Sequence, residues 1–104
     1  MSYATKRGNL LPLMLISTSV DLTGATLGPL KWRRIGETTV VTGVGVLTLV
    51  SASAAGSVVS YAWAAGETDS VGYYEGELDA TIGGKPITVP GLAYFRFAVT
   101  GDIG

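Results

Sequence analysis

Two stretches near the middle of the chain alternate between large apolar side chains and small or charged ones. In residues 58–63, Tyr61 and Trp63 fall on one side and small residues on the other. In residues 73–82, the side that contains Tyr74 is apolar and the other side is mostly acidic. A period of two is typical of β-strands rather than helices. The pattern therefore predicts two strands that each bury one face.

The segment between these strands has the features of a tyrosine corner. Asp69, Gly72 and Tyr74 follow one another in a stretch that is rich in turn-forming residues. In immunoglobulin-type (Ig-type) sandwiches, a tyrosine near the start of one strand is buried, and its hydroxyl bonds to the backbone a few residues upstream. We therefore predict a corner here. The chain has no cysteine, so the disulfide of antibody domains is excluded.

Shorter apolar runs, separated by turn residues, fill the rest of the chain. The predicted strands lie at residues 10–17, 25–34, 38–41, 44–50, 58–63, 73–82, 86–89 and 92–100. Pro12 favours an edge position and Pro29 an edge or a bulge, because proline has no N–H to donate. The pair Gly83-Gly84 or Gly84-Lys85 predicts a tight hairpin. Seven or eight short strands without a helical run predict an all-β, Ig-like antiparallel sandwich.

Aromatic residues recur on the inward side of the predicted strands. Leu30 and Trp32 alternate with Lys31 and Arg33, which predicts a buried tryptophan between outward cations. The residues that we expect to define the fold are Trp32, Tyr61, Trp63, Asp69, Gly72, Tyr74, Phe95 and Phe97.

Length and charge limit the organisation of the chain. Its 104 residues are enough for one hydrophobic core. Residues 10–104 are predicted to form one domain, and residues 1–9, which are polar and include Lys6 and Arg7, a flexible arm that is mobile or orders on a partner. The formal net charge of −1 gives no overall attraction to nucleic acid or to an anionic membrane.

Charged residues are scarce and unevenly placed. They make up 14% of the chain, against about 25% in an average soluble domain, and residues 38–66 contain none. Residues 40–65 are long enough for a membrane helix, but the many small, polar and β-branched residues favour two strands. We therefore predict strands whose outer faces are covered by another molecule.

Few residues are suited to catalysis or metal binding. The absence of His and Cys removes the commonest general base and the thiol nucleophile. Glu75 and Glu77 project from the same side of one strand, which indicates a solvated face rather than a catalytic pair. We expect no enzyme activity and no cofactor. Whether calcium binds to carboxylates is left open; the acidic candidates are Glu67, Asp69, Glu75, Glu77 and Asp79.

Several polar and aromatic residues are candidates for contacts with partners. Trp32 points away from Lys31 and Arg33, so stacking and charge would not act on the same nucleic acid. These two cations are instead predicted to pair with the acidic row of a neighbouring subunit. Tyr3, Tyr73 and Tyr94 fall on outer faces and suit subunit contact or, alternatively, a glycan. The predicted interface residues are Lys6, Arg7, Lys31, Arg33, Glu75, Glu77 and Tyr94.

Several motifs occur in a characteristic order along residues 10–100. They are Leu10-Leu-Pro-Leu, Val20-Asp-Leu-Thr-Gly-Ala-Thr26, Ala55-Gly56 with Val59-Ser-Tyr-Ala-Trp63, Gly66-Glu-Thr-Asp69, Gly72-Tyr-Tyr-Glu75, Gly84-Lys85 and Pro90. Their order resembles the Ig-like domain that opens phage baseplate upper proteins and the similar short proteins of tailed-phage virions. The resemblance implies a structural virion protein, assembled in the host cytoplasm, whose partners are other virion proteins and copies of itself. The alternative is a carbohydrate-binding module for host adsorption.

Overall fold

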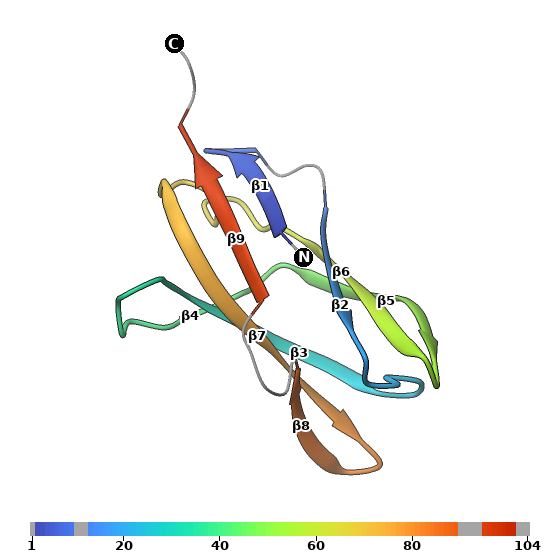
Figure 1. The fold of residues 1–104 in the computed structure, drawn as a ribbon. Helices are drawn as coiled ribbons and strands as arrows, with labels where there is room; N and C mark the ends of the chain where they lie inside the picture. The colour runs from blue at the N-terminus through green and yellow to red at the C-terminus, as the bar shows by residue number, and fades with distance from the viewer. Residues whose placement is uncertain (1, 10–12, 90–94, 102–104) are drawn as a thin grey trace.

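The computed structural model describes residues 2–9, 13–89 and 95–101. This part of the chain contains nine strands and no helix. The strands are β1 (Ser2–Lys6), β2 (Met14–Thr18), β3 (Thr26–Arg34), β4 (Val41–Thr42), β5 (Val46–Ser53), β6 (Gly56–Ala62), β7 (Gly72–Ile82), β8 (Lys85–Val89) and β9 (Phe95–Thr100). They form two sheets that pack face to face (Figure 1). The large sheet has the order β1-β9-β7-β3-β4, with β8 also paired to β7, and the small sheet the order β2-β6-β5. The predicted all-β sandwich is therefore confirmed.

The strand order is that of an Ig-like sandwich. β2, β6 and β5 follow the order of strands B, E and D, and β9, β7 and β3 the order of G, F and C. The chain passes from the small sheet to the large one between β6 and β7, which is where the corner is predicted. All neighbouring strands described are antiparallel except β1 and β9, which run parallel.

Residues 2–9, which we predicted to form a flexible arm, belong to the large sheet. β1 pairs in parallel with β9 along its length. Beyond the strand, the Arg7 N–H donates to the Thr100 carbonyl at 2.7 Å. The Gly8 N–H donates to the carbonyl of the buried Thr68 at 2.9 Å. The prediction of a mobile arm was wrong because it considered only polarity, whereas the backbone N–H groups of this segment find partners on an open strand edge.

Two predicted backbone features are present. The register between β3 and β7 shifts between Leu27 and Leu30, so there is an irregularity at Pro29, where a bulge was one of the two expectations. Gly83 and Gly84 join β7 to β8, and both have positive φ, 56° and 80°. This is the conformation of a tight two-residue hairpin, which glycine adopts without strain.

The strands near Gly43 are shorter or begin later than predicted. β4 has only two residues, and β5 starts at Val46. Between these strands, a Cβ on Gly43 or Gly45 would collide with the ring of Tyr61. The backbone therefore passes over this ring, and only glycine allows such a close approach. The strand predictions for residues 10–12 and 92–94 lie outside the described residues.

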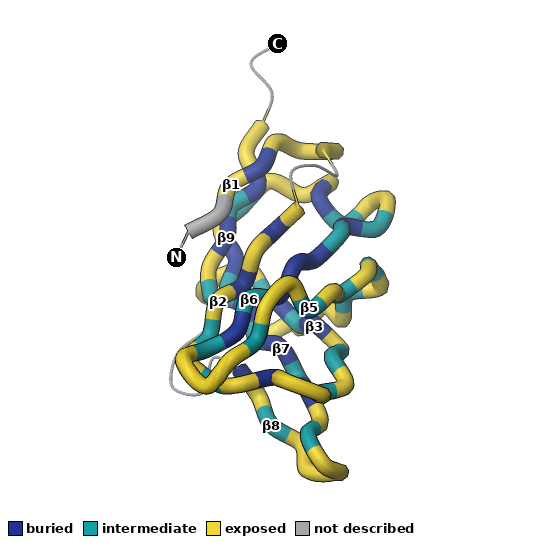
Figure 2. The backbone as a smooth tube through the Cα atoms, turned by 90° about the vertical axis from the view of Figure 1, so that its right-hand side faces the viewer, coloured by how far each residue is buried: buried dark blue, intermediate teal, exposed yellow. Residues whose placement is uncertain are grey.

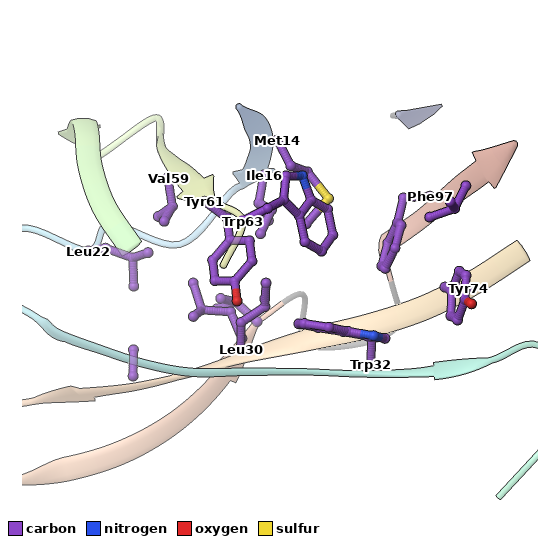
Figure 3. Close-up of a cluster of buried hydrophobic side chains, with 14 residues drawn as sticks. Met14, Ile16, Leu22, Leu30, Trp32, Val59, Tyr61, Trp63, Tyr74 and Phe97 are labelled. Atoms are coloured by element: carbon purple, nitrogen blue, oxygen red, sulfur yellow. The ribbon is translucent and has the colours of Figure 1, made fainter. Parts of the chain in front are cut away.

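Aromatic side chains from both sheets meet in the core (Figure 3). Trp32, Tyr61, Trp63, Tyr74 and Phe97 are each 9% exposed or less, and Phe95 is partly buried. The Trp32 and Trp63 rings meet edge to face with centroids 5.5 Å apart. Tyr74 stacks on Phe97 at 5.1 Å. Such pairs add about 0.5–1.5 kcal/mol each to the free energy gained by burying the rings.

Gly76 occupies the position at which antibody domains have the second cysteine, two residues after the corner tyrosine. Its register partner on β3 is Trp32. A Cβ at Gly76 would come within 2.6 Å of the Lys31 carbonyl and of the Phe95 ring. In antibody domains the tryptophan of strand C packs against the disulfide, whereas Trp32 packs against other aromatic rings. Aromatic packing thus closes this sandwich without a disulfide.

Candidate functional site

The outward side of the small sheet is uncharged and largely apolar, and we call it the bare face. Its outward side chains are apolar or small and uncharged: Leu13, Leu15, Ser17, Val46, Thr48, Val50, Ser51, Ser53, Val58, Ser60 and Ala62. Four of them are 41–63% exposed: Leu13 41%, Leu15 45%, Val46 63% and Val50 58%. The inward side chains of β2 and β6 are buried, whereas those of β5, Leu47 and Leu49, are only partly buried. Figure 2 colours the backbone by this burial.

The composition of the small sheet is unusual for an outer layer. None of its three strands contains Asp, Glu, Lys or Arg. In antiparallel sheets with one solvated face, the outward positions are normally polar. Contiguous exposed apolar side chains in a soluble domain mark an interaction surface. The prediction that another molecule covers this sheet came from the absence of charge in residues 38–66, and the exposure of Val46 and Val50 is a second observation in its favour.

The outward side of the large sheet carries charges of both signs, and we call it the charged face. Its charged side chains are Lys6 on β1, Lys31 and Arg33 on β3, Glu75, Glu77 and Asp79 on β7, and Arg96 on β9. Lys31 Nζ lies 2.9 Å from Asp79 Oδ2, and Arg33 Nε lies 3.5 Å from Glu75 Oε1. The hydrogen bond to Asp79 raises the pKa of Lys31.

These ion pairs show that Lys31 and Arg33 have acidic partners within the chain, where we had considered, from the sequence, only those of a neighbouring subunit. β3 and β7 are antiparallel neighbours, and their register places Arg33 opposite Glu75. Opposite charges on adjacent strands of one face lie close enough to pair within the chain. A shallow depression on this face is lined by both signs of charge, so it favours neither an anionic nor a cationic ligand.

The corner between β6 and β7 forms the expected hydrogen bond. The Tyr74 hydroxyl donates to the Ser70 carbonyl at 2.7 Å. Arg34, which we did not single out from the sequence, donates to the Val71 carbonyl at 2.8 Å and lies over the Tyr74 ring at 5.7 Å. A Cβ on Gly72 would come within 2.7 Å of the Arg34 guanidinium. Gly72 therefore makes room for this arginine, a role that becomes visible only once β3 and β7 are paired.

A smaller apolar cluster lies at the same end of the molecule. Tyr73 is 71% exposed, and Ile35 and Val71 are about half exposed. With Arg34 they line a shallow depression. Asp69 lies exposed in the preceding turn. Tyr73 is thus the one mostly exposed aromatic ring among the side chains that the structure describes.

Glu67 has a structural role that we did not predict. Its Oε1 accepts the Tyr61 hydroxyl at 2.7 Å and the Ala64 N–H at 2.8 Å, and its Oε2 accepts the Val44 N–H at 2.9 Å. The Tyr61 hydroxyl also accepts the Gly45 N–H at 2.8 Å. Burial, and then the hydrogen bond to Glu67, raises the pKa of Tyr61. The carboxylate joins the loop before β5 to the loop after β6.

The remaining predicted contact residues are not brought together. Lys6 and Arg7 are exposed at the end of β1. Lys6 and Glu75 share the charged face but are far apart on it, because Lys6 is paired with Thr100 and Glu75 with Arg96 at the other end of β9. Tyr94 lies outside the described residues.

The acidic candidates for calcium are also spread out. In residues 2–9, 13–89 and 95–101, no three His, Asp or Glu side chains gather closely enough to hold a metal ion. Glu67 already accepts three hydrogen bonds, and Asp79 pairs with Lys31. The same part of the chain has no helix that is long and apolar enough to cross a membrane. Residues 40–65 instead contain β4, β5 and β6.

The fold and its two outer faces define an Ig-like β-sandwich with one charged and one uncharged surface. No protein-family model matches the chain, and no curated protein matches it either.

Proposed function

We propose that this chain is a structural component of a tailed-phage virion, in the tail, baseplate, neck or head, and that it acts through repeated protein–protein contacts. The observation that carries the proposal is the bare face, where Leu15, Val46 and Val50 are exposed on a sheet without any charge. Covering these side chains removes apolar area from water, which stabilises a complex by about 25 cal/mol per Å² before the costs of association.

The phage context is supported by the order of the sequence motifs, from Leu10-Leu-Pro-Leu to Pro90, described above. The contact role is supported by the chemistry of the surface. A charged partner gains little from a face without charges, whereas an apolar protein surface gains from burying it. Because one face of this size is small, many equivalent contacts around a symmetric particle would add up to firm attachment.

The test compares two variants that carry the same new charge. Val46→Asp places a carboxylate on the bare face, and Thr81→Asp places one on the exposed outer side of β7. We expect particles of the encoding phage to retain the wild type and Thr81→Asp, and to lose Val46→Asp by tenfold or more. Absence of the wild-type protein from purified particles would contradict the virion role. Equal retention of both variants would show that the bare face is not the contact surface.

The second candidate function is carbohydrate binding for host adsorption, which the 71% exposure of Tyr73 beside Arg34 favours. Sugars stack on exposed aromatic rings, so Tyr73→Ala should abolish binding to a glycan array, whereas Tyr73→Phe keeps the ring and should retain it. Tyr94→Ala tests the other predicted tyrosine. A wild-type protein that binds no glycan excludes this function.

A further inference from the structure

The free edge of β5 differs from the other edges of the two sheets. Among the described residues, β5 (Val46–Ser53) is paired on one side only, with β6. Its eight residues, VLTLVSAS, include no charge and no proline. An open edge of this kind presents unpaired backbone N–H and C=O groups and is a template for another strand.

The other edges carry features that discourage pairing. β1 ends at Lys6, and β8 begins with Lys85 and Pro86. β4 has only two residues. β2 has five, and Pro12 precedes it in the sequence. Charges, proline and short length are the common means by which proteins protect sheet edges. A bulge is another protective feature, and β5 has one irregularity of this kind, a register shift between Leu49 and Ser51. Residues 46–49 remain a regular stretch.

We propose that β5 pairs with β5 of a second copy of this chain, antiparallel about a two-fold axis. The two small sheets then form one continuous six-stranded sheet. This inference names one partner of the contact module proposed above and rests on that proposal.

The absence of charge allows β5 to pair with β5 of a second copy without repulsion between like charges. In an antiparallel pair, like charges on directly opposite residues are destabilising. A two-fold axis brings identical residues near each other, so a charged strand would meet its own charge, whereas β5 brings none. The charged face lies on the other side of the sandwich and does not enter the joint.

The size of the bare face also favours a second copy. Three strands about 4.8 Å apart, the longest of about eight residues, cover about 370 Å² in projection. A stable interface buries about 800 Å² on each partner, so one bare face is too small by about half. Two faces joined edge to edge offer about 740 Å², which is close to the standard size. Dimerisation through β5 therefore builds a docking surface that one copy lacks.

The experiment uses two lysine variants in the same cross-strand row. The register aligns Leu15 of β2, Ser60 of β6 and Thr48 of β5, so Thr48→Lys and Leu15→Lys add one charge to the same face at opposite edges. Sedimentation over a wide range of concentrations measures the dimer. We expect a wild-type dimer, a dissociation constant raised tenfold or more in Thr48→Lys, and little change in Leu15→Lys. A mixture of Thr48→Lys with Thr48→Glu should restore a mixed dimer.

Backbone exchange gives an independent readout. In residues 46–49, the amide protons that point away from β6 should become slower to exchange as the protein concentration rises, while those of β2 should not change. If Thr48→Lys does not fold, as judged by circular dichroism, Ser51→Lys on the same strand replaces it.

Three results would overturn the inference: a wild type that is monomeric throughout, a dimer that both lysine variants weaken equally, and a dimer that neither weakens. Equal weakening would mean that two bare faces stack instead of pairing at their edges. A monomer that is nevertheless retained in phage particles overturns this inference alone. A β5 dimer that is absent from particles overturns the virion role alone.

Discussion

The charged face and the bare face lie on opposite sides of one core, but their outward side chains differ in whether they find partners within the chain. On the charged face, Lys31 and Asp79, and Arg33 and Glu75, satisfy one another across adjacent strands. On the bare face, Val46 and Val50 have no charged neighbours within the sheet and remain exposed. The charges of the first surface find partners within the chain, whereas the second surface exposes apolar area of the kind that marks interaction sites.

The shared core explains how the faces can differ so much. Trp32 on β3 meets Tyr61 on β6 and Trp63 directly after β6, so the cohesion of the two sheets depends on inward side chains. Neither outer face is needed to hold the sandwich together. Each is therefore free to carry a different surface chemistry, which mutations can test separately from folding.

The largest effect is expected for Trp32→Ala. Removing this side chain, which is 4% exposed, leaves a cavity between both sheets and should lower the free energy of unfolding by about 3–5 kcal/mol. Urea denaturation followed by circular dichroism measures it, and Tyr73→Ala, at an exposed aromatic, should change the value by only about 0.5 kcal/mol. Two separate unfolding transitions would mean that the faces do not share one cooperative core.

The next effect distinguishes two glutamates. Glu67→Gln weakens the carboxylate that accepts the Tyr61 hydroxyl and two backbone N–H groups, and should cost about 1–3 kcal/mol of unfolding free energy. Glu77→Gln, on the charged face, should stay within about 0.5 kcal/mol of the wild type. Equal effects in chemical denaturation would show that the Glu67 network does not hold the small sheet.

Alkaline pH should weaken the protein through Tyr61. Folding raises the pKa of this hydroxyl, so the unfolded chain loses the proton first. The stabilisation is therefore fully present below about pH 10 and is lost as the pH rises above it. In Tyr61→Phe, the unfolding free energy should fall less steeply above pH 10 than in the wild type, whereas Tyr73→Phe should keep the wild-type profile. The same slope in Tyr61→Phe and in the wild type would contradict this assignment.

The sequence predicts features that depend on neighbours along the chain. The alternation around Tyr61 and Tyr74 indicates β6 and β7, and the spacing of Gly72 and Tyr74 indicates the corner. Gly83 and Gly84 indicate the hairpin, because positive φ at two successive positions is a local requirement. These features could be read without knowing which strands pair.

Features that depend on strand pairing could not be predicted in this way. β1 pairs in parallel with β9, which is about 90 residues away along the chain, so this contact leaves no local pattern in the sequence. From composition alone, the segment with Lys6 and Arg7 therefore resembled a free arm. The same limitation assigned Lys31 and Arg33 to a neighbouring subunit, because their partners lie on a strand more than 40 residues away. In both cases the sequence does not show which strand lies beside the residues concerned.

The smallest effect is expected on the charged face. Lys31→Met should lower the unfolding free energy by about 0–1 kcal/mol, and high salt should remove the difference, because a partly exposed ion pair is screened. The exchange of both charges, Lys31→Asp with Asp79→Lys, should restore the stability, since the pair lies within one chain. Mixed with the wild type, the exchanged protein should enter dimers and particles normally. Its exclusion from them would mean that these charges also serve a partner, and that the charged face is not complete in the isolated chain.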